Sequence, residues 1–168
     1  MHFRESRTIK AIGELRASFP YAAALLSYVV VERVLKRYAL DHWSDPLLAR
    51  AKIPGRVKPY GGKALSQLGH LTRTQRLHGI LCEMTLGEIE TLLRRPESER
   101  SASDRNEVVH SNLYLKAEST LPKSKQQALN TARFARAFSH LTRALDQFAG
   151  FAIVERRGGL AVHILTRA

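Results

Sequence analysis

Residues 21–41 read YAAALLSYVVVERVLKRYALD, and this stretch decides the fold class. Its large apolar side chains recur at alternating steps of three and four residues: Leu25, Tyr28, Val31, Leu35 and Tyr38. That spacing predicts one amphipathic helix, although the three consecutive valines at 29–31 favour a strand locally. The apolar run at 21–31 is too short to span a bilayer, so no membrane helix is expected.

Helices are expected on both sides of this stretch, at residues 5–18, 63–81, 85–95 and 104–118. Thr85 is followed three residues later by Glu88, the spacing of a capping box. Residues 96–103 have no apolar side chain larger than alanine, and we expect a mobile loop there. Ser103 or Asp104 is the expected N-cap of the helix that follows.

A last helix is expected to begin after Pro122 and to end at Gly158-Gly159. Its large side chains form a packed seam at steps of four and three: Phe134, Phe138, Leu141, Leu145 and Phe148. An apolar tail of undefined shape follows, within residues 158–168. The whole predicts an all-α protein, a bundle of four or five helices in one domain (1–168) with its core at about residues 20–150.

The composition is that of a basic globular protein. In 168 residues there are 27 Lys and Arg against 15 Asp and Glu, which gives a formal charge of +12. Residues 46–82 hold seven basic side chains and no acidic one, whereas residues 83–118 hold eight of the acids. Such a distribution predicts a surface that attracts polyanions, nucleic acid above all. The other interpretation is a well-solvated surface with many cations.

Metal, cofactor and disulfide chemistry have little support in the sequence. The seven His include no pair spaced for zinc on a helix, and no glycine-rich phosphate loop is present, so neither metal nor cofactor is expected. Cys82, the one cysteine, forbids an intrachain disulfide and lies among apolar residues, as a buried inert thiol does. We expect a cytoplasmic protein.

One segment stands out chemically: Asp104-Arg105-Asn106-Glu107-Val108-Val109-His110. A histidine exchanges protons near neutral pH, and an arginine guanidinium forks onto a phosphate. Cleavage of RNA by its own 2′-hydroxyl needs a base, an acid and a cation for the developing charge. Asn106 is four residues before His110 on one helix face, where its amide would fix the ring tautomer.

Spacing alone does not select this pair. Six Arg–His pairs have four to six intervening residues: Arg37/His42, Arg73/His78, Arg105/His110, Arg133/His140, Arg156/His163 and Arg157/His163. About 2.4 are expected by chance from the composition, so the context must decide. Without that context, Arg105 pairs with an acid such as Glu107 and His110 is an ordinary helix histidine.

The context of Arg105-Asn106-x3-His110 resembles the signature of the HEPN superfamily. Further similarity lies in the preceding short helices, LHGILCEMTLGEIETLLR at 77–94, and in an Ala/Leu-rich first helix that contains Glu32. The resemblance implies a homodimer whose paired motifs line one cleft, and metal-independent RNA cleavage by Arg105 and His110 with Asn106 as the polar neighbour. From its place in an apolar helix, Glu32 either orients Arg105 or is an exposed acid of that helix. In the toxin or defence members it also implies a neutralising antitoxin protein as partner.

The expected function is therefore an endoribonuclease, with RNA held by basic side chains outside the motif: Lys58, Lys63, Arg73, Arg76, Arg133 and Arg136. The other interpretation of the last helix is that Arg133, Arg136 and Arg143 form a solvated face. The alternative function is a non-catalytic regulator or interaction module, as in the mannitol-repressor-like branch that the sequence also resembles. The environment of His110 discriminates: an open basic cleft favours the enzyme, and burial favours the module.

Overall fold

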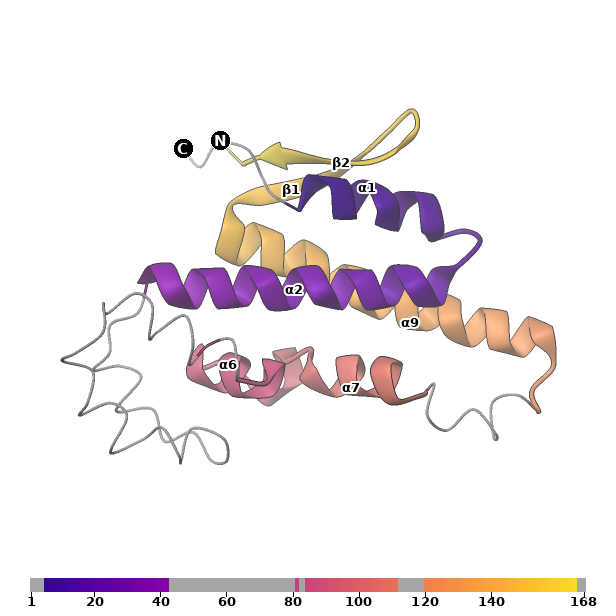
Figure 1. Cartoon of the computed structure of the whole chain (residues 1–168), viewed down its shortest axis with the longest axis horizontal. Helices are drawn as coiled ribbons and strands as arrows, with labels where there is room; N and C mark the ends of the chain where they lie inside the picture. Colours follow the sequence, from indigo (N-terminus) through magenta and orange to yellow (C-terminus); the bar gives the residue numbers. More distant parts are fainter. Residues whose placement is uncertain (1–4, 43–80, 82–83, 112–119, 166–168) are drawn as a thin grey trace. The chain divides into compact units, whose positions relative to one another are not determined.

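The computed structural model describes residues 5–42, 81, 84–111 and 120–165, which are mostly helical with one two-stranded sheet (Figure 1). The predicted helical class is confirmed, but the prediction that the chain is all-α is wrong, because residues 151–164 form a β-hairpin. The chain divides into two compact units. One is Met1–Val34 with Ser103–Ala168, and the other is Leu35–Ala102.

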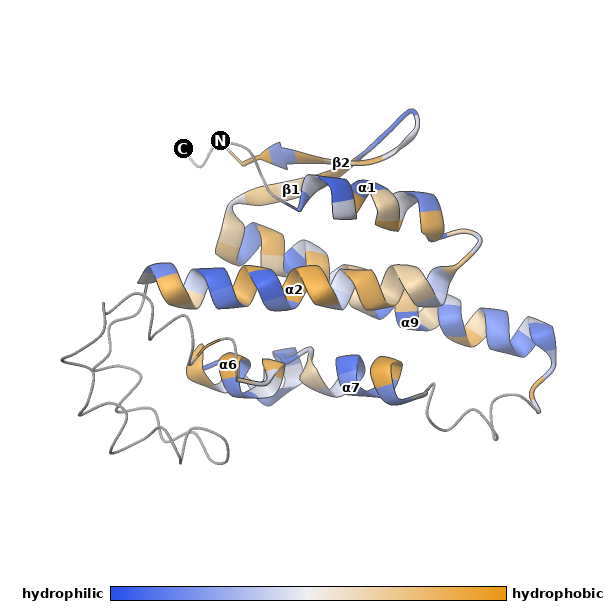
Figure 2. Cartoon of the chain, viewed as in Figure 1, coloured by the Kyte–Doolittle hydropathy of each residue, from blue (hydrophilic) through white to orange (hydrophobic). Residues whose placement is uncertain are grey.

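Helix α2, Pro20–His42, is the long helix that the opening stretch predicts. Tyr28, Val31 and Leu35 from the predicted face are buried. Val29 is 41% exposed, since it lies on the opposite side of the helix. Figure 2 shows a mainly apolar first half of α2, with polar residues interspersed towards its C-terminal end. No described helix is both long and apolar enough to cross a membrane.

The core of the first unit forms where three helices meet. Helix α7, Ala102–Ser111, and helix α9, Lys123–Ala144, both pack on α2 through a buried cluster. Its members are Ala24 and Tyr28 from α2, Val108 from α7 and Ala137 from α9. Two of these are alanines, so the helix backbones approach closely at this level. The cluster fixes the side of α7 that faces the protein.

The last helix ends earlier than expected. After Ala144 the chain makes one π-helical turn, Leu145–Ala149, and stops at Gly150, whose φ of 70° lies in the left-handed region. Glycine adopts this conformation without steric cost and commonly ends helices. The seam continues through the π turn, with Leu141 and Leu145 buried and Phe134 against Phe138 at 5.4 Å between ring centroids.

Strands β1, Phe151–Arg156, and β2, Gly159–Ile164, pair antiparallel from Phe151 opposite Ile164 to Arg156 opposite Gly159. Gly158-Gly159 therefore turns a hairpin and does not end a helix, and the expected apolar tail is strand β2 as far as Ile164. The sheet packs on helix α1, Ser6–Leu15, where Leu160 is buried against Gly13. Figure 1 shows the hairpin beside α1.

The second unit contains helix α6, Leu86–Leu92, and the one-turn 3-10 helix η2, Glu97–Glu99. The predicted capping box is confirmed: the Thr85 side chain accepts from the Glu88 N–H, and the Glu88 carboxylate accepts from the Thr85 N–H. The end of α6 turns back through Arg94, whose φ is 55°. The predicted helix at 63–81 lies outside the described residues except for Leu81, which is helical and buried.

Candidate functional site

Helix α7 carries the candidate residues, and a side chain from another helix accepts hydrogen bonds from the backbone at its start. The Glu90 carboxylate accepts hydrogen bonds from the N–H and hydroxyl of Ser101, both at 2.6 Å, and from the Ala102 N–H at 3.0 Å. The predicted caps, Ser103 and Asp104, are thus incorrect. The expected mobile loop is corrected too, because it contains η2 and ends at the fully buried Ser101. Arg95 lies 3.6 Å from Glu90 as its counter-ion.

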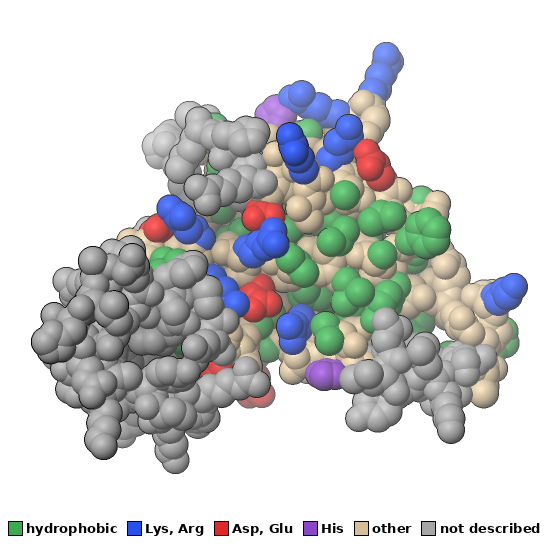
Figure 3. Space-filling view, in the orientation of Figure 1, with side chains coloured by type: hydrophobic (Ala, Val, Ile, Leu, Met, Phe, Trp, Pro, Cys, Tyr) green, Lys and Arg blue, Asp and Glu red, His purple; other side chains and the backbone are tan. Residues whose placement is uncertain are grey.

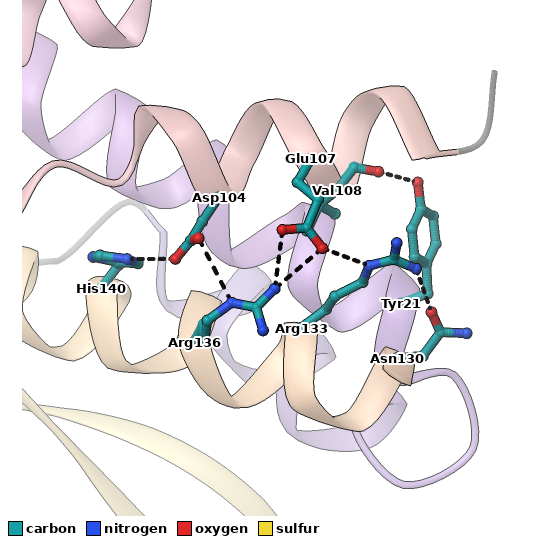
Figure 4. Close-up of polar contacts among 8 residues, drawn as sticks. All are labelled: Tyr21, Asp104, Glu107, Val108, Asn130, Arg133, Arg136 and His140. Atoms are coloured by element: carbon teal, nitrogen blue, oxygen red, sulfur yellow. Dashed lines mark hydrogen bonds and ion pairs between the residues drawn. The ribbon is translucent and has the colours of Figure 1, made fainter. Parts of the chain in front are cut away.

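One face of α7 is tied to α9 by alternating charges (Figure 4). The Arg136 guanidinium donates to both oxygens of Glu107, at 3.2 and 3.3 Å, and its Nε lies 3.6 Å from Asp104. Arg133 donates through Nε to Glu107 at 3.4 Å and through Nη1 to Asn130 at 3.3 Å. Two carboxylates on one helix thus meet two guanidiniums on the other, which sets the register between them.

Two further contacts hold the same face. His140 Nε2 lies 3.1 Å from the second oxygen of Asp104, and the His140 ring faces Tyr28 at 6.2 Å between centroids. The Tyr21 hydroxyl donates to the Val108 carbonyl (Figure 4). The buried Val108 and the polar contacts around it therefore lie on one side of α7, and this side faces the protein. The remaining positions of the motif lie at its flank or in solvent.

Arg105 lies at the flank of α7 and contacts α2. Its guanidinium lies 3.8 Å from the Glu32 carboxylate, and the two side chains are 34% and 24% exposed. The expectation that Glu32 orients Arg105 is supported by this contact. Arg105 also donates to the Asn106 side-chain oxygen at 3.3 Å. Asn106 is therefore a partner of Arg105, whereas its expected contact with His110 is not present. Glu107 pairs with α9 and not with Arg105.

His110 is exposed, and no described residue forms a hydrogen bond or ion pair with it. On an ideal helix it lies about 140° around and about 7.5 Å along the axis from Arg105. Asn106 shares its exposed side. The pair therefore borders a surface that a phosphodiester can reach, with a positioned cation at one edge and an accessible imidazole at the other. Burial of His110, which would favour the alternative function, is not found.

The arginines expected to contact RNA on the last helix have other partners. Arg133 is buried, with 4% of its side chain exposed, so the expectation that it lies on a solvated face is wrong. Arg136 is 41% exposed, and its guanidinium is paired with two carboxylates of α7, those of Asp104 and Glu107. Four further predicted RNA contacts lie outside the described residues: Lys58, Lys63, Arg73 and Arg76.

The α7–α9 charge pairs were not predicted from the sequence, although a signal was present. Asp104 and Glu107 are three residues apart, and Arg133, Arg136 and His140 follow steps of three and four. Each set falls on one helix face. Opposite charges with matching periodicity on two helices are the pattern that would have indicated the contact.

Neither a ligand cluster nor a relative adds to this site. Within the described ranges, no group of three or more His, Cys, Asp and Glu is arranged to hold a metal ion. Comparison with protein families, curated proteins and solved structures finds no match to this chain.

Proposed function

We propose that this protein is a HEPN-type endoribonuclease that cleaves RNA without a metal cofactor, by attack of a 2′-hydroxyl on the adjacent phosphate. The observation that carries the proposal is the arrangement on α7: Arg105 contacts Glu32 and Asn106, and His110 is exposed nearby. In this function His110 acts as the general base and Arg105 stabilises the charge that develops on the phosphoryl oxygens.

The charged residues of α7 have two different roles in this proposal. Asp104 and Glu107 are paired with Arg136, Arg133 and His140, so their negative charge is compensated on the side away from the substrate. Arg105 has only partial compensation from Glu32 at 3.8 Å, which orients the guanidinium and leaves N–H donors for a phosphate. The fold proposed for this activity is a HEPN bundle with an added hairpin.

The test is incubation of end-labelled RNA with purified protein in EDTA. Wild type should give fragments with 2′,3′-cyclic phosphate ends, and His110→Ala and Arg105→Ala should each lose about 10²–10⁴-fold in rate. Ser103→Ala, an exposed change on the same helix, is the matched control and should retain wild-type activity. Cleavage that persists in both His110→Ala and Arg105→Ala would contradict the proposal.

A non-catalytic nucleic-acid-binding module is the second candidate, and one observation favours it. Among the described residues no hydrogen bond joins His110 to Arg105 or Asn106, so in a single chain nothing holds the imidazole in place beside the guanidinium. The same experiment separates the two functions. A module would bind the labelled RNA and release it uncut, with no difference between wild type and His110→Ala.

A further inference from the structure

The β-hairpin has one face on the protein and one face in solvent. Side chains alternate between faces along a strand, so Phe151, Glu155 and Leu160 share one face of the hairpin. On this face Phe151 and Leu160 are buried, Leu160 lies against Gly13 of α1, and Glu155 pairs with Arg16. Ala152, Val154 and Arg156 on β1 therefore point outward, with Ala161 and His163 on β2 beside them. No carboxylate is among these outward residues.

Arg156 and His163 meet on this outward face. The Arg156 guanidinium contacts Nε2 of His163, and both side chains are exposed. Arg157, also exposed, follows directly at the turn. Within the described part of the chain, no carboxylate pairs with Arg156 or Arg157. Arg156 and His163 are also one of the six Arg–His pairs found by spacing, and their side chains are in contact.

Several other arginines of this unit are placed differently. Arg16, Arg33, Arg105 and Arg136 each have a carboxylate within ion-pair distance. At the hairpin a guanidinium is instead placed against an imidazole, and a second guanidinium follows it. Such a group of donors attracts an anion that accepts from several of them at once. Figure 3 shows basic side chains and a histidine along the upper edge, where the hairpin lies in this view.

We propose that Arg156 and His163 on the outward face of the hairpin, together with Arg157 at the adjoining turn, bind the phosphodiester backbone of single-stranded RNA. The choice of RNA rests on the proposed function, whereas the phosphate chemistry does not. Small apolar side chains at Ala152, Val154 and Ala161 leave the face flat, so a backbone can lie along it without meeting a carboxylate. The surface is separate in sequence from the motif on α7 and would hold substrate without taking part in the reaction.

The experiment measures binding without cleavage. The probe is a short fluorescent single-stranded oligoribonucleotide with methylated 2′-hydroxyls, which the proposed reaction cannot cut, and anisotropy is followed as salt increases. Arg156→Gln/Arg157→Gln/His163→Gln should bind about tenfold more weakly at about 0.1 M salt, with a salt slope shallower by about 1.4 for two lost phosphate contacts. Lys123→Gln/Lys125→Gln removes two exposed cations on α9 and is the control of equal charge.

The outcomes are distinct. An unchanged salt slope in the triple variant, or an equal change in the lysine control, would refute the proposal that this surface binds RNA. If the triple variant unfolds, Arg157→Gln alone, at an exposed turn position, should still flatten the slope by about 0.7. DNA of the same sequence should show the same loss, because its phosphates are alike. Wild type that binds through the hairpin but cuts no RNA would refute the proposed function and leave this surface standing.

Discussion

At the scale of single residues, Glu90 has a demanding position, because its side chain is fully buried. It accepts from Ser101 and Ala102 and faces Arg95, so its charge is compensated by three hydrogen bonds and one cation. A buried carboxylate is tolerated only with such partners. Through them Glu90 anchors the first turn of the helix that carries Arg105 and His110.

Replacing Glu90 should therefore cost far more than replacing an exposed acid in the same helix. Glu90→Ala leaves Arg95 and the start of α7 without their acceptor, and we expect a loss of about 3–5 kcal/mol in the free energy of unfolding. Glu88→Gln, in the capping box, should cost about 0.5–1 kcal/mol. Urea unfolding followed by circular dichroism measures both. Equal losses would show that the buried contacts are not stabilising.

Single residues were also where sequence reasoning was least complete. The Arg105–Glu32 contact was one of two interpretations of Glu32, the other being an exposed acid of its helix, and the structure shows the contact. The burial of Arg133 was not, because its type and spacing match those of Arg136, which is ten times more exposed. Only the partner helix distinguishes them. For the same reason the contact of Asn106 was assigned to His110 from helix geometry and lies instead on Arg105.

At the scale of elements, the sequence patterns that involve a single helix gave correct predictions. The face of α2 and the capping box of α6 were both predicted, because each depends on residues three or four apart. The hairpin was missed because the aromatic seam continues to Phe148 and hides the end of α9. Gly150, followed by the β-branched Ile153 and Val154 and then by the glycines at 158–159, was the signal that could have indicated it.

The packing of the hairpin on α1 gives a prediction at this scale. A Cβ added at Gly13 would lie 2.8 Å from the Leu160 backbone nitrogen and 2.9 Å from its Cγ, so the strand must move. Gly13→Ala should destabilise the protein by about 1–3 kcal/mol. Gly87→Ala is the control, since its nearest neighbour is at 3.4 Å and alanine favours a helix. Thermal unfolding should separate them, and a Gly13→Ala variant as stable as Gly87→Ala would contradict this packing.

At the scale of the whole molecule, the proposed function predicts assembly. One Arg–His pair makes a small site, and a two-fold axis places two of them in one cleft. We expect a dimer by light scattering at micromolar concentration. If each site combines Arg105 of one protomer with His110 of the other, mixing inactive Arg105→Ala and His110→Ala should restore about a quarter of wild-type cleavage by random exchange. A monomeric mass would contradict the dimer, and a dimer whose mixture stays inactive would place both residues of a site in one protomer.

The pairing of α1 with the hairpin also has a consequence during translation. Arg16 and its partner Glu155 are 139 positions apart. At about 5–20 residues per second a ribosome needs roughly 7–30 s to connect them. Throughout that interval α1 lacks the strand that packs at Gly13, so the nascent chain presents apolar surface to chaperones. The helix with Arg105 and His110 likewise waits for α9, so each newly made molecule gains its ordered motif only near the end of synthesis.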